Sequence, residues 1–285
     1  MTTTIESLHV YPVKSARGIV LRTAGVDVRG LTAIDAAGRV LAGDREWMVV
    51  DADGRFVTQR EAPRLALVGV NAGTAGIELS VPHLAPTVLA AAPDGPTREV
   101  AVWNHVVPAH DAGDAAAVLL SAWLDRDVRL VRFDRAHRRW CNSEFAGDSG
   151  AHTAFADGYP ILVVGRGSLD DLNARLAARG RPALPMNRFR PNLVVAGLPP
   201  HDEDHLAAIV CGDVVIKPVK PCVRCQITTT DQNSARVGAE PLATLSGYRM
   251  NDRFGGVTFG MNAVVVAGAG ARLEAGAPVR VEYAF

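Results

Sequence analysis

The hydrophobic positions in the first hundred or so residues follow the pattern of β-strands. Residues 5–13 (IESLHVYPV) and 18–28 (GIVLRTAGVDV) are rich in β-branched side chains, which pack well on a pleated sheet. In residues 46–60 (EWMVVDADGRFVTQR) two apolar runs flank Asp53-Gly54, a dipeptide that predicts a tight hairpin. A second hairpin is predicted for residues 65–72 and 76–83, a further strand for 99–111, and an exposed loop for the Pro- and Ala-rich residues 84–100.

The pattern changes near residue 110, where longer helical segments begin. Residues 111–127 predict a helix with an Ala/Leu body and Asp111 or Asp114 as its cap. Residues 168–180 predict a second helix, which Ser168 caps and Gly180 ends. A short helix is predicted for 240–249, and strands for residues 128–133, 159–165, 191–197, 213–219, 226–231, 263–268 and 278–285.

Many short strands with few helices indicate a mainly β fold of the α+β class, built as a β-barrel with helical additions. The 285 residues are enough for two small hydrophobic cores. We therefore expect a first β-barrel-like domain over residues 1–112 and a second β-barrel domain over residues 113–285.

Composition and charge narrow the partners. Thirty Lys plus Arg balance thirty Asp plus Glu, so the chain has no overall field that would attract nucleic acid or an anionic membrane. The N-terminus lacks the pattern of a signal peptide, and no apolar stretch approaches about 18 residues, the length of a membrane helix. We expect a cytoplasmic protein without a membrane anchor. Disulfides are disfavoured there, so the four cysteines are expected to be core residues, ligands or catalysts.

Cys222 and Cys225 form a Cys-x-x-Cys pair whose purpose the spacing alone leaves open. A structural zinc site would need a second pair or two suitably spaced histidines downstream, and the nearest such spacing, His201 to His205, lies upstream, so zinc is the weaker interpretation. A redox pair would need a helix after Cys225, where a β-branched run follows instead. Two interpretations are equally supported by the spacing. In one, the pair only fills the core; in the other, one cysteine binds, as a thiolate favoured by the adjoining Arg224, a metal held within a cofactor.

Several basic residues lie where predicted strands meet loops. Lys14 and Ser15 follow one strand, Arg45 precedes another, and Arg190 and Asn192 open a third. Such residues are more often solvated surface groups, but strand ends are also where barrels hold ligands. Together they could bind an anion such as a phosphate.

The turn formed by Asp157 and Gly158 precedes a buried strand. It can be ordinary turn chemistry, or a carboxylate and a close backbone approach at a site. No Gly-rich phosphate loop and no dinucleotide-binding motif is present in the sequence.

Five segments in this order complete the picture: YPVKSARG, DREWMVVD, FADGYPILVV, FRPNLVV and PCVRCQITTTD. From about residue 5 to the C-terminus the chain resembles the MOSC-domain molybdenum enzymes, in the group that includes the mitochondrial amidoxime-reducing component and its bacterial relatives. The resemblance implies a MOSC N-terminal β-barrel followed by a mostly β MOSC domain. It also implies a molybdenum cofactor (Mo-molybdopterin), a pterin that carries a dithiolene, a phosphate and the metal.

The resemblance assigns roles to single residues. It makes Cys225 the metal ligand and a catalytic residue, leaves Cys222 without a role, and makes Asp157 a catalytic residue that could shuttle protons. The cofactor-binding residues that it implies are Lys14, Ser15, Arg45, Gly158, Arg190, Asn192, Arg224 and, on a looser match, Asn262.

The function implied is an oxidoreductase that reduces N-hydroxylated substrates: amidoximes, hydroxylamines and N-hydroxylated bases. One alternative is a carrier of the cofactor or of sulfur without reductase turnover. Another is a β-barrel binding module whose cysteine pair only fills the core. The chain ends at VRVEYAF without the cysteine-rich ferredoxin domain of some relatives. A separate electron donor is therefore expected, a ferredoxin or a haem or flavin reductase, and the protein itself is expected to be a monomer.

Overall fold

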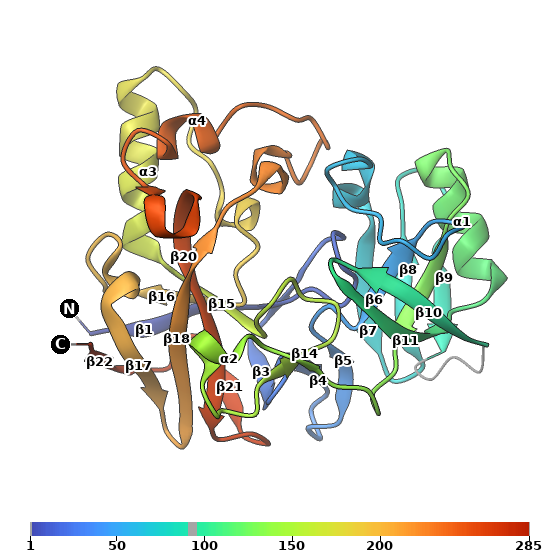
Figure 1. Ribbon diagram of the computed structural model, residues 1–285, viewed down its shortest axis with the longest axis horizontal. Coiled ribbons are helices and arrows are strands. Elements are labelled where there is room, and N and C mark those ends of the chain that lie inside the picture. The colour runs from blue at the N-terminus through green and yellow to red at the C-terminus, as the bar shows by residue number, and fades with distance from the viewer. Residues whose placement is uncertain (1, 91–95, 285) are drawn as a thin grey trace.

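The computed structural model describes residues 2–90 and 96–284. Its main feature is a nine-stranded sheet, seen on the left of Figure 1, with the order β2-β1-β16-β15-β20-β18-β17-β22 and β19 paired to β20. The strands of this sheet are β1 (Thr4–Val10), β2 (Ile19–Leu21), β15 (Ile161–Gly165), β16 (Leu193–Ala196), β17 (Leu206–Cys211), β18 (Val214–Val223), β19 (Met250–Asn251), β20 (Gly256–Ala267) and β22 (Arg280–Tyr283).

Four smaller sheets complete the β structure. Two of them have four strands. The first is β10 (Thr97–Val102), β11 (His105–Asp111), β12 (Arg129–Phe133) and β6 (Trp47–Val50); the second is β21 (Arg272–Glu274), β3 (Thr23–Asp27), β4 (Gly30–Ile34) and β5 (Val40–Gly43). The others are β7 (Gly69–Gly73), β8 (Gly76–Ser80) and β9 (Thr87–Ala90), and the pair β13 (Arg139–Trp140) and β14 (His152–Thr153).

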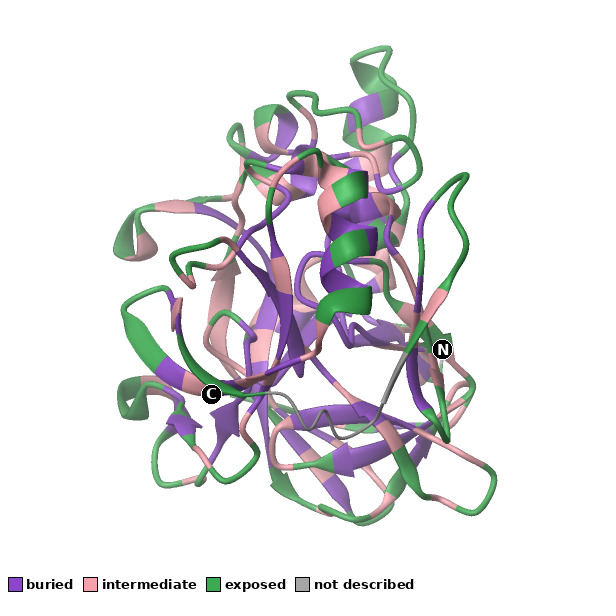
Figure 2. Ribbon diagram, turned by 90° about the vertical axis from the view of Figure 1, so that its right-hand side faces the viewer, coloured by how far each residue is buried: buried purple, intermediate pink, exposed green. Residues whose placement is uncertain are grey.

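The helices are few and lie outside the sheets (Figure 1). They are α1 (Asp114–Leu124), α2 (Ser143–Ala146), α3 (Arg166–Ala178) and α4 (Leu242–Leu245). In Figure 2 the outer face of α1 is exposed. The opposite face carries the buried residues of the helix, which include Leu120 and Trp123. Among the described residues, none of the helices has the length and apolar character needed to cross a membrane.

The prediction of a mainly β fold is confirmed. Strand pairing, however, crosses the expected boundary after residue 112 in both directions. β1 pairs with β16, β21 pairs with β3, and β12 pairs with β6. The division into residues 1–112 and 113–285 therefore stays a prediction.

Of three predicted β elements, one is confirmed and two differ in their pairing. The hairpin over residues 65–83 is confirmed as β7 and β8. At Asp53-Gly54 the turn forms, with Gly54 at a φ of 75°, but β6 takes β12 as its ladder partner and meets residue 56 only through an isolated bridge. The expected single strand 99–111 is a hairpin, β10 and β11, whose turn at Trp103 carries no glycine or proline to mark it.

The predicted exposed loop over residues 84–100 contains β9 and most of β10. Residues 91–95 of that prediction lie outside the described part of the chain. β9 forms because Thr87 to Ala90 pair with β8, an edge that the Pro- and Ala-rich composition does not reveal.

The segment after Cys225 corrects another expectation. Residues 226–231 were expected to be a strand, but Gln226–Thr229 form a short 3-10 helix, η4. The hydroxyls of Thr228 and Thr229 donate to the carbonyls three residues earlier, at 2.9 and 2.8 Å. These local bonds offer the backbone an alternative to the strand that β-branched threonines otherwise favour.

Both predicted helix caps also differ from the structure. α1 begins after Gly113, whose N–H donates to the Asp111 side chain at 2.8 Å. α3 begins after Gly165, two residues before the expected cap, so Ser168 lies inside the helix. The expected end of that helix holds, since Gly180 follows it at a φ of 66°.

Candidate functional site

A cleft of about 280 Å³ gathers every residue that the sequence proposed for the site. These residues are Lys14, Ser15, Arg45, Asp157, Gly158, Arg190, Asn192, Arg224, Cys225 and Asn262. Their convergence is an observation, whereas the role of each one stays a prediction.

The sheet topology explains why residues so distant in sequence meet. β1 runs antiparallel to β16, and β15 runs parallel to β16. The C-terminal end of β1 and the N-terminal ends of β15 and β16 therefore lie on the same side of the sheet, at the ends of its strands. Lys14, Asp157 and Arg190 are in the loops that adjoin these strand ends. Asn262 on β20 lies between Leu162 and Lys220 of the neighbouring strands.

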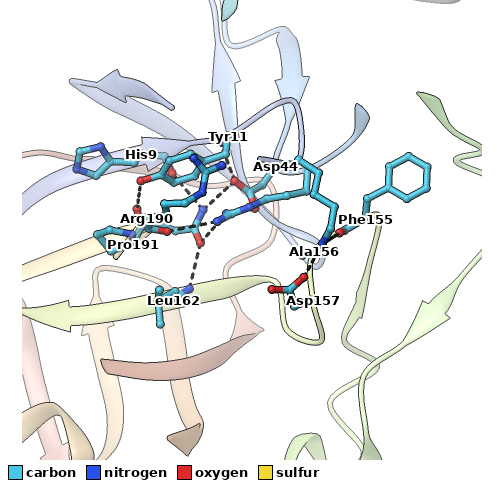
Figure 3. A network of polar contacts seen from close by, with 12 residues as sticks. His9, Tyr11, Asp44, Phe155, Ala156, Asp157, Leu162, Arg190 and Pro191 are labelled. Atoms are coloured by element: carbon cyan, nitrogen blue, oxygen red, sulfur yellow. Dashed lines mark hydrogen bonds and ion pairs between the residues drawn. The ribbon is translucent and has the colours of Figure 1, made fainter. Parts of the chain in front are cut away.

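A network centred on the buried Asp44 lies behind one wall of the cleft and holds the lining residues Arg45 and Asn192 (Figure 3). Its carboxylate accepts from Arg45 Nη1 at 2.5 Å, from Asn192 Nδ2 at 2.9 Å and from the N–H of Tyr11 at 2.9 Å. The side-chain oxygen Oδ1 of Asn192 in turn accepts from Arg45 Nη1 at 3.2 Å and from the N–H of Leu162 at 3.1 Å. Asp44 lies within the DREWMVVD segment, but the sequence did not single it out.

Two guanidinium groups flank the ring of Tyr11. The Cζ atoms of Arg45 and Arg190 each lie 4.3 Å from the ring centroid. Burial, and next the repulsion of Arg45, lower the pKa of Arg190 to about 10. Within the described residues, the Nη2 atom of Arg190 has no hydrogen-bond partner. An anion bound beside these two cations would relieve their repulsion.

Lys14 and Asp157 form an ion pair with an Nζ to Oδ1 distance of 2.5 Å. Lys14 is buried and also donates to the carbonyl of Phe155 at 2.8 Å, while Trp103 Nε1 donates to Asp157 Oδ1 at 3.1 Å. Burial lowers the pKa of Lys14, against the attraction of Asp157.

The same contacts decide the ionisation of Asp157. Desolvation would raise the pKa of Asp157, although 65% of its side chain is accessible to solvent in the cleft. The charge and hydrogen bond of Lys14 and the hydrogen bond of Trp103 prevail and hold that pKa well below its usual range. Asp157 is therefore a carboxylate at neutral pH, which disfavours it as a proton donor. Its catalytic role stays a prediction.

The two cysteines have different cationic partners. Arg224 was expected to favour the thiolate of Cys225, but its Nη1 lies 2.9 Å from the sulfur of Cys222. The sulfur of Cys225 is contacted by Arg60 Nη2 at 3.2 Å. The backbone is extended through Cys225, so alternate side chains share a face and Arg224 points with Cys222.

Arg60 is a candidate site residue that sequence reasoning missed. It lies 165 residues from Cys225, at the end of the segment predicted as a hairpin. No local motif marks it, so only the spatial arrangement reveals it.

Three of the eight non-glycine residues with a positive φ in the described part of the chain line the cleft. Ser15, Arg45 and Arg190 have φ values of 68°, 47° and 55°, in the left-handed region that side chains other than glycine seldom adopt. Each such residue costs roughly 1–2 kcal/mol, and strain of this kind persists mainly at functional sites.

The residues present fit an anionic group that carries its own metal. Among the charged residues of the lining, Lys14, Arg45, Arg60, Arg190, Lys220 and Arg224 are cations and Asp157 is the one anion. Over the described ranges 2–90 and 96–284, no three His, Cys, Asp or Glu side chains gather so as to hold a metal ion. A metal beside Cys225 would thus take its other ligands from a bound group, and six cations suit a group with several negative charges.

Family comparison agrees with this fold. The description "MOSC N-terminal beta barrel domain" matches residues 2–127, and "MOSC domain" matches residues 150–280. The chain therefore belongs to the MOSC family, as the sequence resemblance predicted. MOSC proteins commonly bind a molybdenum cofactor.

Individual relatives are similar over most of the chain. Mitochondrial amidoxime reducing component 2 of Bos taurus is 31% identical over 261 residues, which covers 87% of this chain and 73% of that protein. Mitochondrial amidoxime-reducing component 1 of Homo sapiens is 30% identical over 262 residues, with the same two shares. Molybdenum cofactor sulfurase of Oryza sativa subsp. japonica is 28% identical over 277 residues, covering 90% of this chain but only 32% of that longer protein.

Proposed function

We propose that this protein binds a molybdenum cofactor in the cleft and reduces N-hydroxylated compounds with electrons from a separate donor. The observation that carries the proposal is the convergence of six cationic side chains with two cysteines, Cys222 and Cys225, in a single cleft. The similarity to amidoxime reducing components supports the reductase activity.

The proposed roles follow from the contacts of each residue. Cys225 would bind the metal, while Arg45 and Arg190, fixed around Tyr11 and Asp44, would hold the anionic part of the cofactor. Arg60 would keep positive charge beside the Cys225 sulfur. The bound cofactor would supply the two-electron redox centre for cleavage of the N–O bond.

The overall reaction takes up two electrons and two protons, and an N-hydroxylated substrate leaves as the N–H compound and water. Asp157, ionised and paired with Lys14, can orient a substrate N–H or O–H group by accepting a hydrogen bond. The protons would come from water or the substrate side of the cleft, since the Asp157 carboxylate has none to give at neutral pH.

A carrier of cofactor or sulfur is the second candidate. It is supported by the similarity of nearly the whole chain to part of a molybdenum cofactor sulfurase. The half-buried Cys222, whose sulfur Arg224 contacts at 2.9 Å, would be a second sulfur near the cofactor in that case.

One experiment separates these functions. The protein is purified from cells that make the cofactor, its molybdenum is measured, and a model amidoxime is offered with reduced viologen as donor. Bound molybdenum with turnover supports the reductase, and bound molybdenum without turnover with any N-hydroxylated compound supports the carrier. A protein that retains neither molybdenum nor pterin would overturn the proposal.

A further inference from the structure

Trp103 occupies a strained position at the tip of the β10–β11 hairpin. Val102 pairs with His105, so Trp103 is the first of two turn residues, and its φ is 54°. Glycine fits this conformation readily, whereas a bulky aromatic residue is an outlier there. The tip lies toward the middle of the molecule in Figure 1, facing the half that contains the main sheet. The strain therefore accompanies a side chain directed at the cleft.

The indole N–H of Trp103 joins the hairpin to the Lys14–Asp157 pair. Nε1 donates at 3.1 Å to the same Asp157 oxygen that Lys14 contacts at 2.5 Å. The Lys14 ammonium also lies 5.8 Å from the centroid of the indole ring. Two donors thus hold this carboxylate oxygen in one place.

The ring of Trp103 supports the cation at Cys225. The Cζ atom of Arg60 lies 4.9 Å from the ring centroid, within the range of a cation–π contact. The Phe56 ring packs at 5.0 Å from the indole, and Arg60 reaches the Cys225 sulfur at 3.2 Å. Trp103 is not among the residues that line the cleft. It acts through Asp157 and Arg60, which do line it.

We propose that Trp103 is a positioning residue of this site. Its N–H orients the Asp157 carboxylate, and its ring face holds the Arg60 guanidinium against Cys225. The inference rests on the proposed function of the cleft and deepens it by adding a residue outside the cofactor pocket. The left-handed backbone at residue 103 is retained because it directs the indole to both groups.

Two substitutions divide these contacts. Trp103→Phe keeps a ring beside Arg60 and Phe56 but removes the N–H, and Trp103→Ala removes both. We expect kcat/KM for a model amidoxime to fall about tenfold in Trp103→Phe and about a hundredfold in Trp103→Ala, as for loss of one and then two contacts to charged groups. Molybdenum content should remain at the wild-type level in Trp103→Phe.

Trp140 offers a matched control. Its side chain is 57% exposed against 42% for Trp103, and its aromatic contacts are with Arg138 and His152, away from the cleft lining. Trp140→Phe and Trp140→Ala should keep wild-type kcat/KM. A role for Trp103 in folding alone would lower the urea midpoint and leave the kcat/KM of the folded Phe variant unchanged, which would overturn the proposal.

A second measurement is independent of the cofactor. In the amide and indole NMR spectrum of the cofactor-free protein, the Trp103 Nε1–H signal is identified by its loss in Trp103→Phe. Asp157→Asn and Arg60→Lys should each shift this signal and leave that of Trp140 in place. If the wild type has no molybdenum or turnover, the proposed function fails and this spectrum still decides the contacts. An unshifted signal in both variants refutes the positioning role.

Discussion

Cys222 and Cys225 are three positions apart, yet they face different guanidinium groups. The extended backbone sends Arg224 to the same side as Cys222, and Cys225 faces Arg60 from a distant segment. Adjacency in sequence is therefore a poor guide to which guanidinium group lies beside which thiol.

The first prediction concerns these two thiols. Cys225→Ser should lose the metal ligand, and with it reductase activity and the molybdenum spectrum of the wild type. Cys222→Ser should keep most of both, because its sulfur has its own partner in Arg224. Molybdenum content and turnover with reduced viologen are the measurements. If the two variants exchange behaviour, the assignment of the ligand is wrong.

The second prediction concerns the cations Lys14, Arg45 and Arg190. Replacing any one by Ala removes a charge-assisted contact of about 1.5–3 kcal/mol and should lower cofactor affinity roughly ten- to a hundredfold. The measurement is molybdenum content of the purified variants when the cofactor is limiting. Arg39→Ala is the control, because Arg39 is largely exposed and pairs with Asp35 outside the cleft lining. Full occupancy in all three variants would contradict the prediction.

At the scale of elements, helix α3 shows how a distant residue sets a helix end. The N–H of Gly165 and the hydroxyl of Ser168 both donate to the carboxylate of Glu203, at 3.0 Å and at 2.6–2.7 Å. Glu203 comes from a short 3-10 helix, η3 (Asp202–His205), and is fully buried. An acceptor from elsewhere in the chain thus replaces the local cap that the sequence suggested.

The third prediction tests that arrangement through pH. Burial raises the pKa of Glu203 above its ordinary value of 4.5. At a pH between 4.5 and the raised pKa, Glu203 keeps its proton in the folded protein but has lost it in the unfolded chain. The free energy of unfolding therefore falls as pH rises through this window. Glu203→Gln cannot ionise, and its free energy of unfolding relative to the wild type should therefore increase from pH 4 to pH 7.

Urea unfolding at several pH values measures this effect. Glu203→Ala leaves two buried donors without an acceptor and should lower the free energy of unfolding by about 2 kcal/mol. Asp170→Asn, at an exposed position of α3, is the control and should follow the wild type. A Gln variant whose difference from the wild type does not change with pH would show that Glu203 is not the group responsible.

At the scale of the whole molecule, the cleft depends on both halves of the chain. Lys14, Arg45 and Arg60 come from the part matched by the N-terminal barrel, and Cys225 comes from the MOSC domain. The two parts are joined near the cleft by reciprocal hydrogen bonds between the side-chain amides of Gln59 and Gln232, at 3.0 and 3.1 Å. A site assembled in this way exists only when the complete chain is folded.

The fourth prediction is that turnover needs a separate electron donor. The chain has no dinucleotide-binding motif, and Cys141, Cys211 and Cys222 are too few for an iron–sulfur cluster, which needs about four thiolates. With NADH or NADPH alone, the pure protein should reduce no N-hydroxylated substrate. Adding a ferredoxin with its reductase, or reduced viologen, should start turnover. Robust turnover from NADH alone would show that a cofactor site has been missed.

Most of the strands, and the residues at their ends, could be predicted from the amino-acid sequence. Runs of apolar side chains are a local property, and Lys14, Arg45, Asp157 and Arg190 adjoin such runs. The MOSC resemblance then placed these residues in one site, where the structure also gathers them.

Which groups touch depends on the packing of the folded chain. Arg60 at Cys225, Glu203 at the start of α3 and Trp103 at Asp157 are contacts between segments 165, 38 and 54 residues apart. The hairpin at Trp103 and the 3-10 helix after Cys225 also departed from their local signals. Local periodicity reports the face of a strand on which a side chain lies. Its partner on another segment depends on how the whole chain packs, which no short stretch of sequence encodes.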